Sequence, residues 1–226
     1  LIVDPEDNIY LTQRSGNGWI IRKSNPGGII THFAGNGMQG NTGDGGPAIE
    51  ASFHTIADIA ADKRGNIYIA DSINRNIRKV DRQGIISTIY KDSLDILGTE
   101  VHPNGIVIDK VGNIFFSDSG SSKVYKIATS GDITLIAGTG DFDDHGDKGL
   151  ALNAGLRSPG GLAIGPDGSL YIAEQTTHRI RKIDSNGIIT GYVGNGKYGY
   201  SGDGGSAIKA NIKAPFRMDF DREGNL

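Results

Sequence analysis

The sequence contains no cysteine, so no disulfide can hold the chain together and a small disulfide-stapled scaffold is excluded. No apolar run approaches the length of a membrane-spanning helix, so no membrane segment is predicted in this region. No window combines a sustained 3.6-residue apolar period with capping residues, so helices should be no longer than a turn or two. The net charge is −3, so the chain has no excess of basic residues, and nucleic acid is not predicted as a partner.

Glycine is abundant instead, with 35 residues, about twice the average share. It marks a repeat: the segment DKRGNIYIAD at 62–71 returns in altered form from Asp4, Asp109 and Gly165, and begins again at Asp221. A period near 50 residues indicates tandem copies of one supersecondary unit.

Each copy contains four short segments rich in Ile, Val and Tyr, separated by Gly, Asn and Asp turns, which predicts four antiparallel strands. We name these strands a to d in chain order. The strand b segments are predicted at Asn8–Leu11, Asn66–Ala70, Asn113–Ser117 and Ser169–Ala173. The fold class is therefore an all-β propeller of four-stranded antiparallel blades, with four blades and the start of a fifth visible.

Residues 65–80 and 169–183 resemble the NHL repeat. The inserts TGDGGPAIEASF (42–53) and SGDGGSAIKANI (201–212) resemble a variant found in bacterial NHL-type proteins. The resemblance covers essentially the whole chain and implies a ring of about six blades. It does not fix a function, because the family includes binding scaffolds, sensor domains, RNA-binding domains and a lyase group.

Residues 1–226 are expected to form a single propeller domain that is incomplete at its C-terminus and belongs to a longer chain. Leu1–Asp4 and Met218–Asp221 both read as strand a, and the sequence stops at Asn225-Leu226, where a strand b should begin. The two ends therefore duplicate one another, which predicts that the ring does not close within this chain.

Three connections between blades carry long inserts with an equivalent aspartate after a glycine: Asp44, Asp147 and Asp203. These carboxylates are expected to be structural, capping the first turn of a short helix or binding their own loop backbone. Calcium is the alternative, since residues 141–146 approach a calcium-loop sequence, although His145 stands where Asp or Asn is needed. No cofactor is predicted beyond that calcium alternative.

A second periodic set consists of acids at the end of strand b and basic residues in strand c. The acids are Asp71, Asp118 and Glu174, and Arg22, Arg78 and Arg181 follow in strand c. Because they recur with the repeat, these residues are expected to be structural. The acids should hold the b–c loop through backbone N–H groups or pair with a basic neighbour.

The residues just before strand a are not periodic, and they should surround the mouth of the central channel on the face that carries the long inserts. The predicted ligand-binding residues are His54, Asp58, His102, Asn104, Arg157, Lys213 and Arg217. A ring of unlike polar groups suits a small ligand, in particular an anion. The alternative is a rim of solvated residues.

No catalytic or metal site is predicted. The two G-x-G-x-x-G matches, at Gly35 and Gly194, do not open a helix inside a βαβ unit, as dinucleotide binding requires. Zinc would need His54, His102 or His178, which occupy unlike positions without a supporting carboxylate cluster. No nucleophile–base pair stands out from the repeat.

These features favour a non-catalytic domain that presents one loop face to a protein, peptide or glycan, outside the cytoplasm of a bacterium, in an extracellular or periplasmic location. The alternative function is an enzyme of the lyase or lactone-hydrolase type with a metal in the channel.

Overall fold

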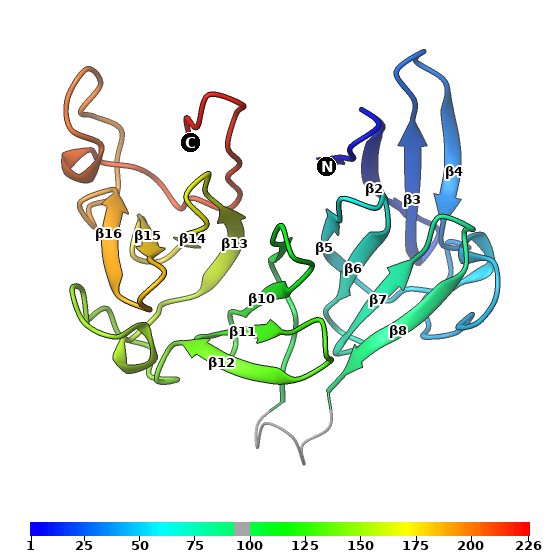
Figure 1. Ribbon diagram of the computed structural model, residues 1–226, viewed down its shortest axis with the longest axis horizontal. Coiled ribbons are helices and arrows are strands. Elements are labelled where there is room, and N and C mark those ends of the chain that lie inside the picture. The colour runs from blue at the N-terminus through cyan, green and yellow to red at the C-terminus, as the bar shows by residue number, and fades with distance from the viewer. Residues whose placement is uncertain (93–99) are drawn as a thin grey trace. The chain divides into compact units, whose positions relative to one another are not determined.

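A computed structural model describes residues 1–92 and 100–226. It contains four antiparallel sheets of four strands each, with orders β1-β2-β3-β4, β5-β6-β7-β8, β12-β11-β10-β9 and β13-β14-β15-β16 (Figure 1). We call these sheets blades 1 to 4 in chain order. The chain divides into two compact units, Leu1–Gly112 and Asn113–Leu226, which are described separately here as unit 1 and unit 2.

Unit 1 contains blades 1 and 2 and a short strand, β9. Its strands are β1 (Ile2–Val3), β2 (Ile9–Ser15), β3 (Gly18–Ser24), β4 (Ile30–Ala34), β5 (Ile56–Ala61), β6 (Ile67–Asp71), β7 (Asn76–Val80), β8 (Ile86–Lys91) and β9 (Ile106–Ile108), with a 3-10 helix η1 (Ala48–Glu50) between β4 and β5. Its core lies between blades 1 and 2, where Tyr10, Ile21 and Ala34 pack with Ile67 and Ile86 in one buried cluster.

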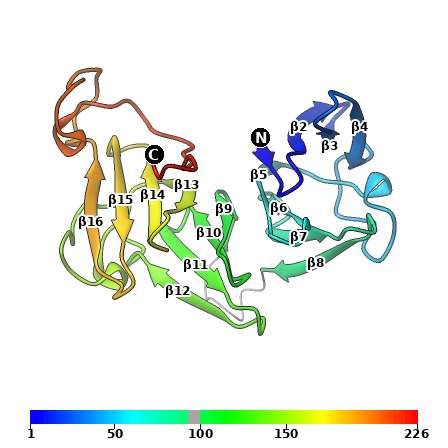
Figure 2. The same cartoon turned by 45° about the horizontal axis from the view of Figure 1, so that its top comes forward.

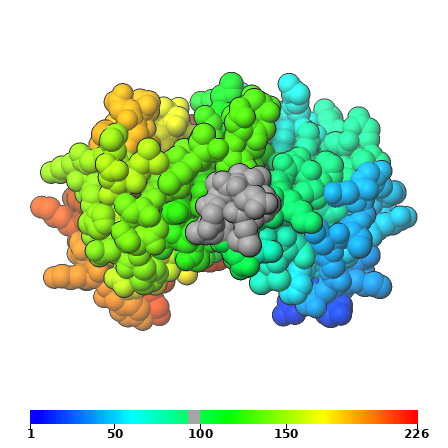
Figure 3. Space-filling model, turned by 90° about the horizontal axis from the view of Figure 1, so that it is seen from below, coloured from blue at the N-terminus to red at the C-terminus, as the bar shows by residue number. Residues whose placement is uncertain are grey.

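Unit 2 contains the other strands. They are β10 (Ile114–Asp118), β11 (Lys123–Ile127), β12 (Ile133–Ala137), β13 (Pro159–Ile164), β14 (Leu170–Glu174), β15 (Arg179–Ile183) and β16 (Ile189–Val193), with 3-10 helices η2 (Ala151–Asn153) and η3 (Ala207–Lys209). β10 contacts β13, and the Ser117 hydroxyl on β10 donates to the Gly160 carbonyl on β13 at 2.6 Å. Figure 2 shows β13 to β16 as neighbouring strands of one sheet, and Figure 3 shows the outer surface from below, coloured by residue number.

The a–b turns are fixed by one aspartate each. Asp62 accepts the backbone N–H groups of Arg64 and Asn66 and the Asn66 side-chain amide, at 2.7–2.9 Å. Gly65 adopts φ +78° in this turn, a conformation that glycine enters at little cost. This turn places strand b directly beside strand a.

The predicted strand b segments are confirmed as β2, β6, β10 and β14, each beginning one residue later than expected. The prediction that helix is limited to short turns is also confirmed, since the described helices are three residues each. None of them could cross a bilayer within the part of the chain that the structure describes.

One expected strand is wrong. Met218–Asp221 forms no strand, although Gly161 N–H donates to the Phe216 carbonyl at 2.9 Å. A strand requires a continuous hydrogen-bonded neighbour, and among the described residues none pairs with Met218–Asp221 in a ladder. Residues 1–226 as a single incomplete domain, and a ring that does not close, stay predictions.

Candidate functional site

The three inserts between blades share one local structure. After each strand d, a glycine N–H donates to the first residue of the 3-10 helix: Gly35 to Ala48, Gly138 to Ala151 and Gly194 to Ala207, at 2.8–3.0 Å. The insert therefore folds back against the strand that precedes it. This common geometry follows from the shared Gly-Asp-(Gly/Lys)-Gly sequence, and it fixes the position of the aspartate in all three copies.

In the first insert, the aspartate binds a buried arginine of the next blade. Arg78 on β7 is fully buried, and its Nη2 and Nε donate to Asp44 Oδ1 at 2.6 and 3.2 Å. Its remaining donors reach the carbonyls of Thr42 at 2.9 Å and Ser52 at 3.1 Å. The Phe53 ring centroid lies 5.2 Å from the guanidinium. The insert is thus a guanidinium receptor that joins blade 1 to blade 2.

The second insert repeats this arrangement in unit 2. Arg181 on β15 is fully buried, and its Nε donates to Asp147 at 2.9 Å. Its Nη groups donate to the carbonyls of His145 at 3.0 Å and Gly155 at 2.8 Å. The positions match the first insert residue for residue, so the receptor is a property of the repeat.

Asp44, Asp147 and Asp203 do not cap the 3-10 helices, which was one of the two structural roles predicted for them. The residues at the N-caps of η1, η2 and η3 are Pro47, Leu150 and Ser206, and none provides a side-chain cap. Asp44 binds Arg78 and the Thr88 N–H instead. Burial alone would raise the pKa of Asp44, but the hydrogen bonds from Thr88 and Arg78 outweigh it and hold the pKa below its ordinary value. The sequence interpretation missed this pairing because it sought partners for the arginines only among the strand b acids.

Among residues 1–92 and 100–226, no arginine pairs with Asp203 in the third insert. Asp203 accepts a hydrogen bond from the Tyr200 hydroxyl at 2.9 Å. The alanine that is buried in the other two inserts, Ala48 and Ala151, is exposed here as Ala207. The structural role predicted for Asp203 is not tested by these contacts and stays a prediction.

The strand b acids hold the backbone just before strand a. Asp71 accepts the N–H groups of His54 and Thr55 at 2.9–3.2 Å, and Glu174 accepts the N–H of Arg157 at 2.8 Å. Asp118 instead accepts the Gly120 N–H in the b–c loop at 2.9 Å, as expected. Two of the three acids therefore position the backbone of predicted ligand residues.

Burial shifts both of these carboxyl groups toward the neutral form. It raises the pKa of Asp71 above its ordinary value and raises the pKa of Glu174 to about 7. For Glu174, the hydrogen bond from Arg157 N–H and the charge of Arg181, 3.7 Å away, offset burial only in part. Arg181 donates at shorter distances to Asp147 and to the carbonyls of His145 and Gly155 in the second insert. Its charge is therefore balanced mainly by Asp147.

In unit 1, the predicted ligand residues contact other residues of the same unit. Asp58 is buried and accepts the Ile106 N–H at 3.2 Å, which connects β5 to β9. His54 Nδ1 lies 3.2 Å from the Thr55 hydroxyl. His102 Nδ1 lies 3.2 Å from the Ser72 carbonyl. Asn104 is half-buried nearby in sequence.

In unit 2, the predicted cations lie over exposed aromatic rings. The guanidinium of Arg157 lies 4.8 Å from the Phe142 ring centroid, and the ammonium of Lys213 lies 5.2 Å from that of Tyr198. Phe142 is 55% exposed and Tyr198 is 63% exposed. Arg217 lies 5.9 Å from the exposed ring of Phe216. Sequence reasoning identified the cations and missed Phe142 and Tyr198, which lie in the same connections between blades as Arg157 and Lys213.

His54, Asp58, His102 and Asn104 belong to unit 1, whereas Arg157, Lys213 and Arg217 belong to unit 2. That all seven surround one channel mouth stays a prediction.

In the segment considered for calcium, residues 141–146, one carboxylate already pairs with an arginine of the protein. Asp144 pairs with Arg179 on β15, and the Asp143 carboxylate accepts the Asp144 N–H. At the equivalent register in blade 2, Asn76 donates to Asn41 at 2.9 Å, so an amide pair has been replaced by an ion pair. Within residues 1–92 and 100–226, no three His, Cys, Asp or Glu side chains gather as metal ligands. Calcium stays an untested alternative.

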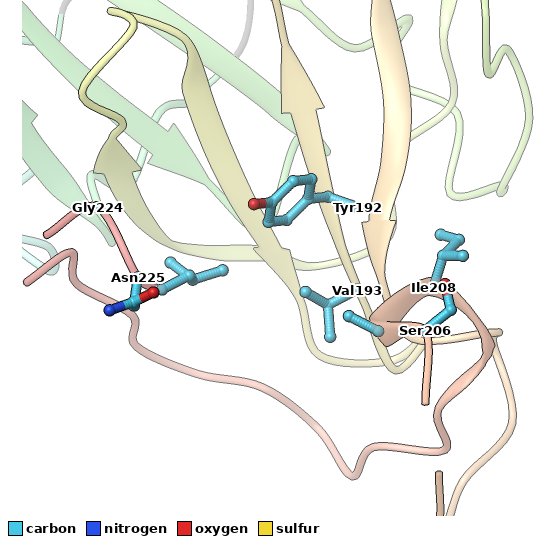
Figure 4. Close-up of a pocket in the computed structure, with 8 residues that line it drawn as sticks. Tyr192, Val193, Ser206, Ile208, Gly224 and Asn225 are labelled. Carbon is cyan, nitrogen blue, oxygen red and sulfur yellow. The ribbon is translucent and has the colours of Figure 1, made fainter. Parts of the chain in front are cut away.

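A hollow of about 440 Å³ lies beside the third insert (Figure 4). It is lined by Tyr192, Val193, Ser206, Ala207, Ile208, Gly224, Asn225 and Leu226. Tyr192 and Val193 come from β16 and Ile208 comes from η3, with Asn225 across from them.

Comparison with known proteins identifies a family. The profile of the Teneurin NHL domain matches residues 31–100 and 137–201, more than half of the chain. Teneurin-1 of Gallus gallus is 29% identical over 220 residues, covering 83% of this chain. Human Teneurin-4 is 28% identical and covers 81% of it. The chain spans only 8% of the length of these relatives.

Solved structures confirm the β-propeller fold. A protein of unknown function from Bacteroides thetaiotaomicron superposes with a TM-score of 0.76 at 21% identity, over 98% of this chain and 54% of that one. A chain in a nidogen/laminin complex gives 0.65 at 18% identity, over 98% and 67%. Virginiamycin B lyase from Staphylococcus aureus gives 0.57 at 18% identity, over 84% and 53%. At these identities the likeness concerns the fold alone.

Proposed function

This chain belongs to the Teneurin NHL domain family, and on that premise we propose that it is a non-catalytic binding domain whose insert-bearing face binds a protein. The family supports a binding role, and a neighbour in fold was solved in a nidogen/laminin complex. The same proposal extends to a peptide or a glycan as the ligand.

The observation that carries the proposal is the pairing of cations with exposed aromatic rings on the inserts of unit 2. Arg157 lies over Phe142 and Lys213 lies over Tyr198, and both rings are more than half exposed. Aromatic and arginine side chains dominate the energetic centres of protein interfaces. A stacked cation fixes the ring orientation before binding, so less side-chain entropy is lost when a partner covers the ring.

The proposal is tested with a displayed library of random twelve-residue peptides selected on the immobilised chain. We expect selected peptides to bind saturably and to lose affinity by at least about tenfold when Phe142 or Tyr198 is replaced by alanine, the loss typical of an interface anchor. Fluorescence anisotropy with labelled peptides measures the affinities.

Ser185→Ala is the control. Ser185 is exposed and lies in the turn between β15 and β16 of unit 2, at the end of these strands that strand alternation places away from the inserts. Its replacement should leave affinity unchanged. Peptides that bind equally well to the chain lacking Phe142 and Tyr198 would refute the proposed face.

The second candidate function is an enzyme of the lyase or lactone-hydrolase type. We consider it because one structural neighbour is a virginiamycin B lyase. Incubation of the chain with virginiamycin B and divalent metal, followed by mass spectrometry, tests it. Metal-dependent opening of the antibiotic, absent with the His54→Ala and His102→Ala chain, would replace the binding proposal with an enzymatic one.

An extracellular location accompanies the proposed function, and the fold neighbour in the nidogen/laminin complex supports it. The curated relatives named above are animal proteins, so they give no support to a bacterial source or a periplasmic location.

A further inference from the structure

In unit 2, Arg157 is a charged side chain without a charged partner. Its guanidinium lies 4.8 Å from the centroid of the Phe142 ring. It forms no ion pair within residues 1–92 and 100–226, and its buried Nε has no hydrogen-bond partner there. Both arginines of β15 beside the second insert, in contrast, pair with aspartates of that insert. The Arg157 guanidinium therefore keeps donors that no acid of the described chain uses.

The position of the Phe142 ring is exposed although blade 4 covers the second insert. Arg181 of blade 4 binds the insert, and Leu150 forms a β-bridge to Ile188, yet Phe142 is 55% exposed. Gln39 is the equivalent residue of the first insert, which blade 2 covers in the same way, and Gln39 is also exposed. Exposure therefore belongs to this position of the repeat.

The repeat fixes the backbone of Arg157 and leaves its side chain free to vary. Glu174 accepts the Arg157 N–H at 2.8 Å, and Asp71 accepts the N–H of the equivalent residue, His54. Both contacts use only the backbone, so the packing of the blades does not require an arginine over an aromatic ring here. The pair of Arg157 and Phe142 is specific to the second insert and is already positioned for a ligand.

The chemistry of this pair suits a carboxylate beside an apolar group. The guanidinium fork matches a carboxylate in two-point hydrogen bonding, and it can do so while it lies over an aromatic ring. The exposed part of the Phe142 ring offers apolar surface next to it. Asp141 and Asp143, on either side of Phe142, are exposed acids, and like charges brought together at an interface are costly. A polyanion such as a sulfated glycan is therefore disfavoured, and a single carboxylate is the better match.

We infer that Arg157 and Phe142 recognise one acidic side chain, an aspartate or a glutamate, that stands next to an apolar side chain in the partner protein. The carboxylate binds the unused N–H groups of Arg157, and the apolar neighbour covers the Phe142 ring. This inference rests on the proposed binding function and names the group that the face recognises. It concerns unit 2 alone.

The chemistry of the ligand is tested with two displayed libraries of twelve-residue peptides, one that includes aspartate and glutamate and one that lacks both. The peptides are fused at their C-terminus, so they carry no free α-carboxylate. We expect binders from the acid-containing library only. Binders of equal affinity from the acid-free library would overturn this inference, and if they depend on Phe142 the proposed binding face still stands. Failure of both libraries would overturn the proposed function and this inference with it.

The residue that reads the carboxylate is tested with a double-mutant cycle in fluorescence anisotropy. Arg157→Gln, or replacement of the acid of a selected peptide by its amide, should each weaken binding at least about tenfold, and the two together no further than one alone. Arg157→Gln leaves the Glu174 contact in place because that contact uses the backbone N–H. Additive losses would overturn the pairing.

Lys148→Gln is the matched control. Lys148 is an exposed cation of the same insert, and its N–H donates to the Ile189 carbonyl on β16. Its replacement removes the same charge and should leave peptide affinity unchanged, whereas a loss equal to that of Arg157→Gln would reduce the effect to net charge and overturn the site. Binding of a labelled heparin oligosaccharide that Arg157→Gln abolishes would identify a polyanion as the ligand and would also overturn the inference.

Discussion

Replacing Arg78 with methionine should destabilise unit 1 strongly. The side chain is fully buried and its guanidinium binds the Asp44 carboxylate and the carbonyls of Thr42 and Ser52. Methionine retains the apolar stem and removes every donor. Each hydrogen bond to a charged group contributes about 1.5–3 kcal/mol, and breaking a buried ion pair costs about 3–5 kcal/mol.

The Asp44 side chain is 48% exposed, so water can solvate its carboxylate once the arginine is lost. The loss therefore comes mainly from the two carbonyls, and we expect about 3–4 kcal/mol of unfolding free energy. That is a large part of the total stability of a domain, about 5–15 kcal/mol. Urea unfolding followed by the fluorescence of Trp19, the single tryptophan, measures it, because Trp19 lies on β3 in unit 1.

Arg22→Met is the matched control. Arg22 occupies the same register in blade 1 but is only half-buried, and we expect its replacement to cost less than about 1 kcal/mol, as for an exposed charge. Equal losses for Arg22→Met and Arg78→Met would refute the conclusion that the insert, rather than the strand position, stabilises the arginine.

Three further changes test separate features. The pKa of Glu174 is raised to about 7 in the folded chain from 4.5, so its stabilising contribution is complete below pH 4.5 and is lost as the pH rises through 7. This amounts to roughly 3 kcal/mol. Glu174→Gln should remove that fall in urea stability curves, and parallel curves would contradict it. Asp62→Ala removes a carboxylate that accepts four hydrogen bonds; it should cost about 2–3 kcal/mol and lower the pKa of Tyr68 from about 12, as ultraviolet titration would show. Gly45→Ala meets no atom within 4 Å, whereas a Cβ at Gly43 would meet backbone at 2.7 Å. We expect about 1–2 kcal/mol for Gly45→Ala from its φ of +81° and clearly more for Gly43→Ala, and the reverse order in thermal melts would be inconsistent with the close packing of the insert.

Local sequence predicted the blades well because their information is local. Strand b of each blade follows a turn held by an aspartate, and in blades 1 and 2 its hydrogen bonds join residues two to four positions apart. Strand composition and turn residues act over the same short range. The repeat then supplied several independent copies of the same pattern, which is why β2, β6, β10 and β14 each begin within one residue of the predicted position, although β2 continues to Ser15.

The candidate site was only partly predictable. Charge and lack of periodicity pointed to Arg157 and Lys213, but the rings beneath them, Phe142 and Tyr198, lie in irregular inserts where no period indicates orientation. Asp58 was predicted as a ligand residue, and in the structure it accepts the Ile106 N–H, 48 positions away in sequence. A contact of that separation has no signature in one sequence.

The sequence alone therefore determined the strands, the turns and the repeat, because backbone preferences and side-chain alternation act between near neighbours. Tertiary structure decided which groups surround each charged side chain. Arg78 reaches Asp44 across 34 residues, and Glu174 acquires its raised pKa from burial beneath neighbouring segments. Both effects arise only in the folded chain, because desolvation and hydrogen bonding depend on which groups packing brings together.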